Sequence, residues 1–234
     1  FFLKDFNDIK KVSDYWIAAQ DRINLYNENI TFLKTHSALC TLENNSFTDK
    51  KNTKAVIYIV RDPRNLITSF SHHYGMNIKD TYEFITNVNQ ILTGSEWGGA
   101  NFGIATVLGN WAEHYKSWKR IKFAPFLLIK YEDLIKDTKG SLTQIINFLS
   151  NFMNIEKNEE KILNTVNSCK FDRLALKEKE EGFFEAVSPR KDDKKVNFFY
   201  LGKKNKWNEI LTNNQINLLN TKFEKDLKIL EYEY

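Results

Sequence analysis

The chain has 234 residues, of which 42% are hydrophobic and 27% are charged, so it is long enough for one domain with a substantial core. The formal net charge of +4 comes from acidic and basic residues mixed along the sequence, which does not indicate a nucleic-acid or membrane partner. Two cysteines are too few for a disulfide framework, and no Cys/His cluster has the spacing of zinc ligands. This composition is typical of a cytoplasmic protein.

Residues 1–11 do not predict a targeting signal. No apolar run approaches the roughly 20 residues of a membrane span, and the opening FFLKDFNDIKK lacks the order of a signal peptide. The sequence begins at Phe1 rather than at a Met. We therefore expect residues 1–234 to form a single domain whose N-terminal part is missing.

A Lys-Thr-His tripeptide follows the first expected elements. Residues 8–26 have an approximately helical apolar stripe, and residues 30–33 predict a short strand. Lys34 and His36 are two positions apart, so an extended backbone lets both face one edge of a sheet. His is the usual general base near neutral pH. The alternative is a surface His36, because such a tripeptide is common.

The central strand is predicted by the run AVIYIV at residues 55–60. The run is too short for a helix and continuous enough for a parallel strand buried on both faces. Asp62 is a good N-cap and Pro63 fits the first helical position, so a helix should follow this strand directly and run to about residue 73.

Two residues next to this strand suit a phosphate. Arg61 lies where parallel strands end and helix N-termini bind anions. Its planar guanidinium offers several donors, and Ser69 can add a hydroxyl from the following helix. The alternative is that Arg61 pairs with Asp62 and that Ser69 is an ordinary surface residue.

The pattern Tyr-x-x-Arg-[Asn/Asp]-Pro-x-[Asn/Asp]-x-x-x-Ser, from Tyr58 to Ser69, resembles the cytosolic-type sulfotransferases that use 3′-phosphoadenosine 5′-phosphosulfate (PAPS). The resemblance implies an α/β, P-loop-like three-layer fold with a central, mostly parallel sheet flanked by helices. It implies that Arg61 and Ser69 hold the 3′-phosphate of PAPS. It also implies that His36 removes the acceptor's proton, that Lys34 lies close to the sulfuryl group, and that no metal takes part.

The middle of the chain contains turns and helices. Residues 40–52 are polar and predict a hairpin or loop, and residues 81–92 predict a helix with Thr81 as a possible cap. Residues 93–103 hold four of the nine glycines in the chain. This loop, which includes Trp97, either lines an acceptor pocket or is a plain linker.

Residues 106–119 predict a further helix. Its Gly109-Asn110-Trp111-Ala112-Glu113-His114 segment resembles the Gly-Ser-Trp-x-x-His segment of sulfotransferases. That resemblance implies a helix passing the acceptor pocket, with His114 as a candidate pocket residue. The helical spacing of the aromatic residues also fits a role in the core.

A second buried strand is predicted at residues 126–130 and ends in Tyr131-Glu132-Asp133-Leu134. Acidic residues at a helix start are favourable without any function. The tetrapeptide also resembles the Tyr-Glu-Asp-Leu segment of sulfotransferases, which implies that Tyr131 contacts the nucleotide.

Helices are predicted between residues 140 and 176 and over residues 213–230, while the charged residues 177–206 between them are typical of a solvated loop. However, residues 198–207 resemble the sulfotransferase pattern Phe-Arg-Lys-Gly-x-x-Gly-x-Trp, whose Arg, Lys and Gly wrap the 3′-phosphate.

Gly202 and Trp207 match that pattern in place. Tyr200 and Leu201 stand where the pattern has Arg and Lys, and Asn205 stands where it has its second Gly. The departures remove two positive charges. Because a phosphate needs donors rather than one fixed position, Lys203, Lys204 or Arg190 can supply replacements. We therefore expect Gly202 and Lys203 to contact the cofactor.

Together, the resemblances of these segments imply sulfuryl transfer from PAPS to a hydroxyl or amine of a small-molecule or glycan acceptor. Sulfotransferases also carry a Pro-Lys-[Ser/Thr]-Gly-type loop that cradles the 5′-phosphosulfate, and nothing before Lys34 matches it. The alternative is an inactive nucleotide-binding or scaffolding relative. A nucleotide kinase would need a Gly-x-x-x-x-Gly-Lys-[Ser/Thr] loop, which the sequence lacks.

Overall fold

The structure is a computed structural model, and it describes residues 5–23, 30–93, 104–186 and 196–232. The elements in these ranges are α1 (Ile9–Ser13), α2 (Trp16–Gln20), β1 (Thr41–Leu42), β2 (Asn45–Ser46), β3 (Val56–Val60), α3 (Pro63–Tyr74), α4 (Ile78–Thr86), β4 (Ile91–Leu92), β5 (Thr106–Val107), α5 (Trp111–Lys119), β6 (Phe126–Lys130), α6 (Tyr131–Lys136), α7 (Thr138–Leu149), α8 (Glu159–Ser168), α9 (Phe171–Glu181), η1 (Gly202–Lys204), α10 (Trp207–Ile210) and α11 (Asn213–Ile229).

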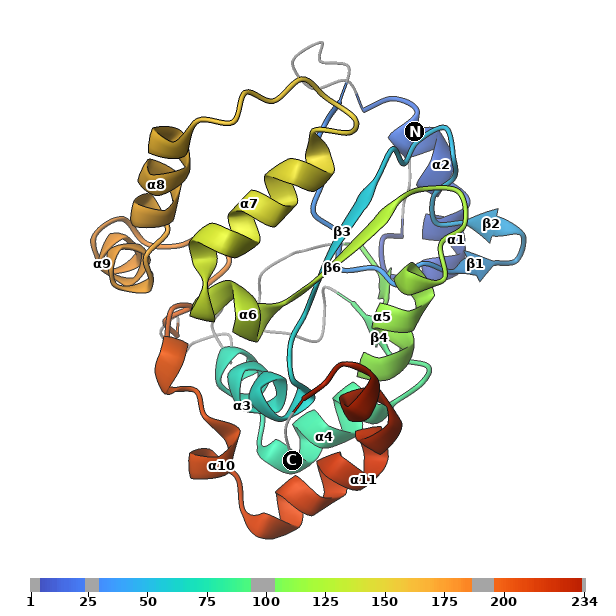
Figure 1. Ribbon diagram of the computed structural model, residues 1–234. Coiled ribbons are helices and arrows are strands. Elements are labelled where there is room, and N and C mark those ends of the chain that lie inside the picture. The colour runs from blue at the N-terminus through green and yellow to red at the C-terminus, as the bar shows by residue number, and fades with distance from the viewer. Residues whose placement is uncertain (1–4, 24–29, 94–103, 187–195, 233–234) are drawn as a thin grey trace.

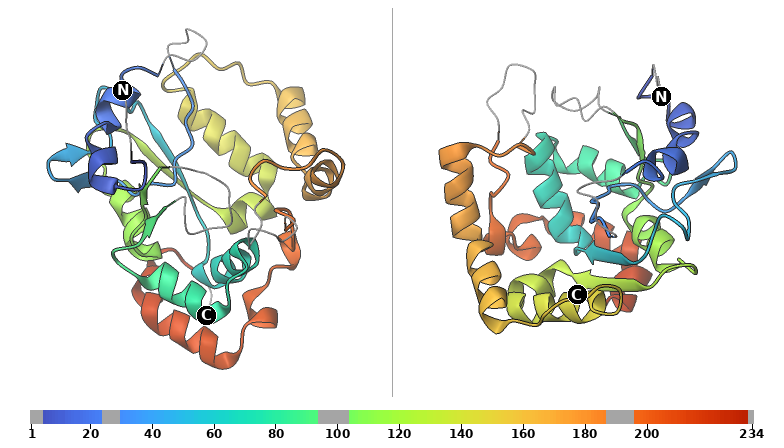
Figure 2. Two further views of the ribbon diagram at one scale, coloured as in Figure 1. Left: turned by 180° about the vertical axis from the view of Figure 1, so that it is seen from behind. Right: turned by 90° about the horizontal axis from the view of Figure 1, so that it is seen from above.

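Strands β3 and β6 form a parallel pair at the centre of the molecule (Figure 1), with Val56 opposite Phe126 and Val60 opposite Lys130. Helices α8 and α9 lie at one side of this strand pair, and α1, α2 and the β1–β2 hairpin lie at the opposite side (Figures 1 and 2). The expected α/β class, with parallel strands flanked by helices, is confirmed.

The junction between β3 and α3 is as predicted. Pro63 occupies the first turn of α3, and the Asp62 carboxylate accepts a hydrogen bond from the backbone N–H of Arg64 at 2.8 Å. This contact satisfies one of the free N–H groups of the helix start. Gly75, with φ of 62°, caps the other end.

The two faces of β3 differ in burial. Tyr58 and Val60 pack into the main core with residues of α5 and α11. Ile59 points to the opposite face, because side chains alternate along a strand, and it is 53% exposed. The expectation that both faces of this strand are buried is therefore wrong at Ile59.

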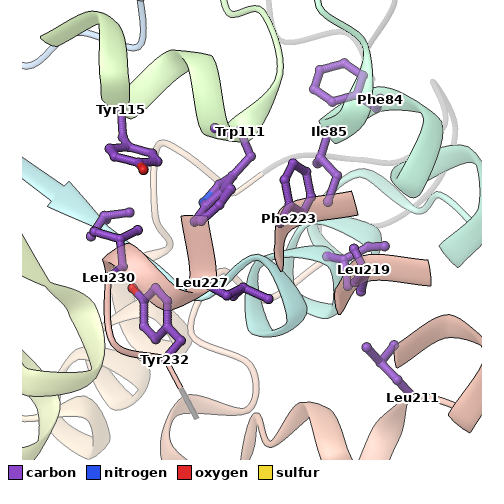
Figure 3. Close-up of a cluster of buried hydrophobic side chains, with 13 residues drawn as sticks. Phe84, Ile85, Trp111, Tyr115, Leu211, Leu219, Phe223, Leu227, Leu230 and Tyr232 are labelled. Carbon is purple, nitrogen blue, oxygen red and sulfur yellow. The ribbon is translucent and has the colours of Figure 1, made fainter. Parts of the chain in front are cut away.

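The main core joins α3, α4, α5 and α11 to the parallel strands, and Figure 3 shows most of its side chains. Trp111 of α5 packs edge-on against Phe223 of α11 with ring centroids 5.0 Å apart. Helix α11 begins with a capping box between Thr212 and Gln215. Apolar contacts along this long helix thus hold the C-terminal region against the site-bearing elements.

Residues 40–52, which predict a hairpin or loop, contain a hairpin. Thr41 pairs with Ser46 and Leu42 with Asn45 in an antiparallel ladder. The two residues of the turn, Glu43 and Asn44, both have positive φ, at 46° and 77°. Such a turn matches the twist of the flanking strands.

Two predictions in the N-terminal third are wrong. Within residues 8–26 there are two short helices rather than one, because α1 ends at Ser13 and α2 begins at Trp16; residues 24–29 lie outside the described ranges. Residues 30–33 form no strand, and Phe32 and Leu33 are 62% and 57% exposed.

Two helix boundaries also differ from prediction, because Asn side chains cap these helices. Asn77 accepts a bond from the N–H of Asp80, so α4 begins before Thr81, which is fully buried inside it. Asn110 accepts one from the N–H of Glu113, so α5 begins at Trp111. The residues just outside these helices pair instead as β4 and β5.

Candidate functional site

Arg61 lies at the carboxyl end of β3, where the sequence placed it. Its guanidinium stacks on the ring of Tyr131, at 4.6 Å from the ring centroid. Its Nε is buried, and no hydrogen-bond partner for it exists among the described residues. Burial lowers the pKa of Arg61, but an arginine remains charged at neutral pH. The result is a partly buried cation with an unused donor.

The alternative pairing of Arg61 with Asp62 does not form. Asp62 instead binds Arg64, whose Nε and Nη2 donate to the carboxylate at 3.0 and 2.7 Å, and both side chains are buried. The Arg64 guanidinium also lies 4.1 Å from the ring centroid of Trp207. Because Asp62 is engaged in this way, it forms no ion pair with Arg61 among the described residues.

The start of α6 is tied to the same edge. The carboxylate of Glu132 accepts bonds from the backbone N–H of Asp62 at 3.1 Å and from the hydroxyl of Tyr232 at 3.2 Å. Tyr131 therefore occupies a fixed place beside Arg61. Ser69 lies half-buried on α3, eight positions after Arg61 in the sequence.

Lys34 and His36 lie in an irregular segment. Both side chains are exposed, and Lys34 forms an ion pair with Glu185, from the residues that follow α9. The pKa of His36 is lowered, first by partial desolvation and then by the positive charge of Lys34, while Glu185 acts in the opposite direction. Such a neutral imidazole can accept a proton at physiological pH.

Glu185 is a contact that the sequence did not indicate. It lies 151 positions from Lys34, in a charged stretch that is typical of a solvated loop. Two other glutamates, Glu180 and Glu181, stand close to Glu185 in the sequence and carry the same charge, so either could have paired with Lys34. Local sequence patterns do not distinguish among them.

Gly202 has a φ of 54°, in the left-handed region that favours glycine. A Cβ placed on it would lie 2.8 Å from the ring of Phe171. Lys203 is exposed, and Arg190 lies outside the described residues.

Tyr200 stacks on the ring of His72, with centroids 3.6 Å apart and planes 7° apart. His73 packs edge-on against Phe198 at 5.6 Å. Both histidines are half-buried. The C-terminal segment covers this part of α3, which the helical pattern alone did not reveal.

His114 is also more constrained than predicted. Its Nδ1 lies 2.6 Å from the hydroxyl of Tyr58, and its Nε2 lies 3.0 Å from the backbone oxygen of His36. Burial lowers the pKa of His114. The candidate pocket residue thus contacts the segment of the candidate base directly. Its other ring nitrogen contacts Tyr58 on β3, a pairing that the sequence did not predict.

A family model described as "Sulfotransferase domain" matches residues 10–231, which is nearly the whole chain. The chain belongs to the sulfotransferase family. The match contains each of the site residues discussed above, so one family pattern covers Lys34, Arg61 and Gly202 alike.

Mouse sulfotransferase 2A1 is 35% identical over 95 residues, which cover 40% of this chain and 30% of the mouse protein. Human sulfotransferase 2B1 is 34% identical over 97 residues, covering 40% of this chain and 24% of the human protein. A 3-alpha-hydroxysteroid sulfotransferase of Cavia porcellus is 28% identical over 107 residues, covering 44% of this chain and 34% of that protein. These matches therefore span about a third or less of each sulfotransferase.

Solved structures share the fold. Mouse sulfotransferase SULT7A1, solved in complex with PAP, superposes with a TM-score of 0.51 at 24% identity, covering 76% of this chain and 59% of that one. Retinol dehydratase, solved with androsterone and the inactive cofactor PAP, gives a TM-score of 0.52 at 21% identity, covering 79% of this chain and 50% of that one.

Two searches of the described residues were negative. No helix within them is long and apolar enough to cross a membrane. They also contain no group of three or more His, Cys, Asp or Glu side chains placed to hold a metal ion.

Proposed function

We propose that this sulfotransferase domain transfers a sulfuryl group from PAPS to a hydroxyl or amine of an acceptor. The observation that carries the proposal is the buried, unpartnered Nε of Arg61 at the carboxyl end of a parallel strand. A donor in this position suits a phosphate, because an arginine binds phosphate oxygens through several N–H groups at once.

Arg61 and Ser69 would hold the 3′-phosphate, and Tyr131 would contact the nucleotide beside them. Gly202 and Lys203 would complete the site from the C-terminal segment. Lys203 is exposed and therefore available to an anion. The PAP complexes of SULT7A1 and retinol dehydratase support a nucleotide of this type.

His36 would act as the general base, with Lys34 beside it. PAPS, when bound, supplies an activated sulfuryl group. His36 accepts the proton of the acceptor hydroxyl or amine as the acceptor atom bonds to sulfur and the bond from sulfur to the 5′-phosphate oxygen breaks, which leaves PAP. The Lys34 ammonium stabilises the negative charge on the sulfuryl oxygens.

The acceptor is proposed to be a small molecule with an apolar body. Phe32 and Leu33 precede Lys34 and are largely exposed, and Phe184 beside Glu185 is 74% exposed. Apolar side chains around polar catalytic groups are typical of small-molecule sites. The steroid named for the Cavia porcellus relative has such an apolar body with a hydroxyl. These apolar contacts do not specifically favour a glycan.

Residues 1–234 are proposed to form one domain that acts in the cytoplasm. Cys40 and Cys169 are free thiols, and free thiols persist in reducing compartments. Locating the full-length native protein in fractionated cells tests this assignment.

The decisive experiment is calorimetric binding of PAP and of 5′-AMP to wild type and to Arg61→Ala. We expect Arg61→Ala to weaken PAP binding by about 10- to 100-fold, the effect of about 1.5–3 kcal/mol for a charged hydrogen bond, with little effect on 5′-AMP. Arg120→Ala, an exposed arginine at the end of α5, is the matched control. Equal losses for both nucleotides would contradict the assignment of Arg61.

The second candidate is a nucleotide-binding or scaffolding relative without catalysis. It is favoured by Tyr200, which replaces a cation of the sulfotransferase pattern and is stacked on His72. This candidate predicts PAP binding without sulfate transfer. A radiolabelled-sulfate assay with phenol and steroid acceptors distinguishes the two, since transfer by wild type and none by His36→Ala establishes catalysis.

A further inference from the structure

Helix α5 supports the segment that carries His36. Side chains at positions 114, 117 and 118 lie on one face of a helix. His114 Nε2 lies 3.0 Å from the His36 oxygen, Trp118 Nε1 donates to the Ser37 oxygen at 2.9 Å, and the N–H of Leu39 donates to Ser117 Oγ at 2.9 Å. Together with the bond from the N–H of Ala38 to the Val107 oxygen at 2.7 Å, these side chains supply hydrogen-bond partners for a segment without regular structure.

The hydrogen bonds of His114 define its tautomer. The backbone oxygen of His36 can only accept, so Nε2 of His114 carries a proton. Burial lowers the pKa of His114 and raises that of Tyr58, so both groups are neutral near pH 7. Nδ1 is then an acceptor, and the Tyr58 hydroxyl donates to it at 2.6 Å.

This arrangement leaves no free ring nitrogen on His114 for an acceptor molecule. It also connects the central strand to the candidate base, because Tyr58 belongs to β3 and packs into the main core. The imidazole of His36 itself stays exposed and is not part of these bonds. The chain of contacts therefore holds the backbone of His36 and leaves its ring available.

We infer that Tyr58 and His114, together with Trp118, are positioning residues that hold the main chain of His36 so that its imidazole meets the acceptor. The inference rests on the proposed function of His36 as general base. A misplacement of about 1 Å in a catalytic group can cost 100-fold in rate. The support therefore acts on turnover rather than on binding of the nucleotide.

Two substitutions of His114 distinguish its bond as a donor to the His36 oxygen from its bond as an acceptor from Tyr58. In His114→Gln the amide nitrogen takes the place of Nε2 and can still donate to the His36 oxygen. In His114→Asn the shorter amide takes the place of Nδ1, reaching Tyr58 but not His36. We expect kcat to fall about 10- to 100-fold in His114→Asn and to stay near wild type in His114→Gln, with unchanged PAP affinity in both.

An acceptor-binding role for His114 predicts a different result. It would raise the acceptor KM at unchanged kcat, and by different factors for different acceptors. That result, or equal kcat losses in the Gln and Asn variants, would overturn the inference. Thermal unfolding of each variant identifies any that fail to fold. In that case a spectroscopic measurement on the wild-type protein tests the inference instead.

The spectroscopic test needs no activity. Nitrogen-15 NMR of the wild-type histidine rings at about pH 7 should show His114 neutral, with the proton on Nε2, and Tyr58→Phe should shift its Nδ1 resonance. A doubly protonated ring or a proton on Nδ1 would overturn the inference. If wild type shows this tautomer but transfers no sulfate to any acceptor, the proposed function fails while the structural support stands.

Discussion

The side-chain oxygen of Asn205 accepts a 2.6 Å hydrogen bond from the hydroxyl of Thr68, which joins the C-terminal segment to α3. The amide nitrogen of Asn205 donates to the backbone oxygen of Asn65 at 2.9 Å, and the N–H of Trp207 donates to the Asn65 side chain at 3.0 Å. Asn205 stands where the sulfotransferase pattern has a glycine, so this chain adds a side-chain anchor at that point. The anchor holds the segment that carries Gly202 and Lys203.

Asn205→Ala should lower the free energy of unfolding by about 1–3 kcal/mol, because it removes buried hydrogen bonds. Urea denaturation measures the change. Asn208→Ala, an exposed residue on α10, should stay within about 0.5 kcal/mol of wild type. Equal stabilities of the two variants would show that the Asn205 contacts contribute nothing.

Arg64→Met should cost about 3–5 kcal/mol, since it leaves the buried Asp62 carboxylate without its cation. Arg64→Lys keeps the charge but cannot make the paired bonds of a guanidinium, so an intermediate loss is expected. The free energy of unfolding in urea again gives the result. A loss below about 1 kcal/mol for Arg64→Met would mean that the buried pair is not formed.

Gly202→Ala should destabilise the C-terminal segment for two separable reasons. The backbone strain of a left-handed residue costs about 1–2 kcal/mol, and the new Cβ meets the ring of Phe171. Measured in a Phe171→Ala background, the penalty of Gly202→Ala should shrink to the backbone part. An identical penalty in both backgrounds would rule out the steric contribution.

Stability should fall as the pH drops below about 6.5, the usual pKa of an unfolded histidine. Burial lowers the pKa of His114 in the folded state, so the unfolded chain binds more protons between the folded pKa and about 6.5. Above about pH 6.5 the neutral histidine therefore makes its whole contribution to stability, and this contribution is lost as the pH falls towards the folded-state pKa. Urea denaturation at about pH 7.5 and 5 measures this loss of stability. The loss should be smaller in His114→Gln. If the pH dependence of stability is the same in that variant as in wild type, the role of His114 is contradicted.

Glu185→Gln should move the acidic limb of the kcat profile to lower pH. The carboxylate favours the protonated form of His36, and its removal also leaves the Lys34 charge unneutralised, so both changes lower the pKa of His36. Glu181→Gln is the matched control, as Glu181 contacts Lys177 rather than Lys34. A shift in the opposite direction would exclude His36 as the group that titrates.

The sequence by itself determined the elements whose signals lie within a few residues. An apolar β-branched run followed by Arg61, Asp62 and Pro63 is sufficient for a strand, a cap and a helix start, and the structure has all three. The polar turn before this strand likewise formed its hairpin. The resemblance to sulfotransferases, which indicated the fold and the candidate site, likewise rested on short motifs.

Only the tertiary structure decided which partners the side chains of the candidate site take. Asp62 binds Arg64 rather than its neighbour Arg61, Lys34 pairs with Glu185, and His114 bridges Tyr58 to the backbone of His36. The last two contacts join positions far apart in the sequence, and several residues of the same type could have made each of them. For the buried pair of Asp62 with Arg64 and for His114 on α5, packing selects the partner, because a buried donor or acceptor without a partner is costly. The exposed Lys34 meets Glu185 because the fold brings these two segments together.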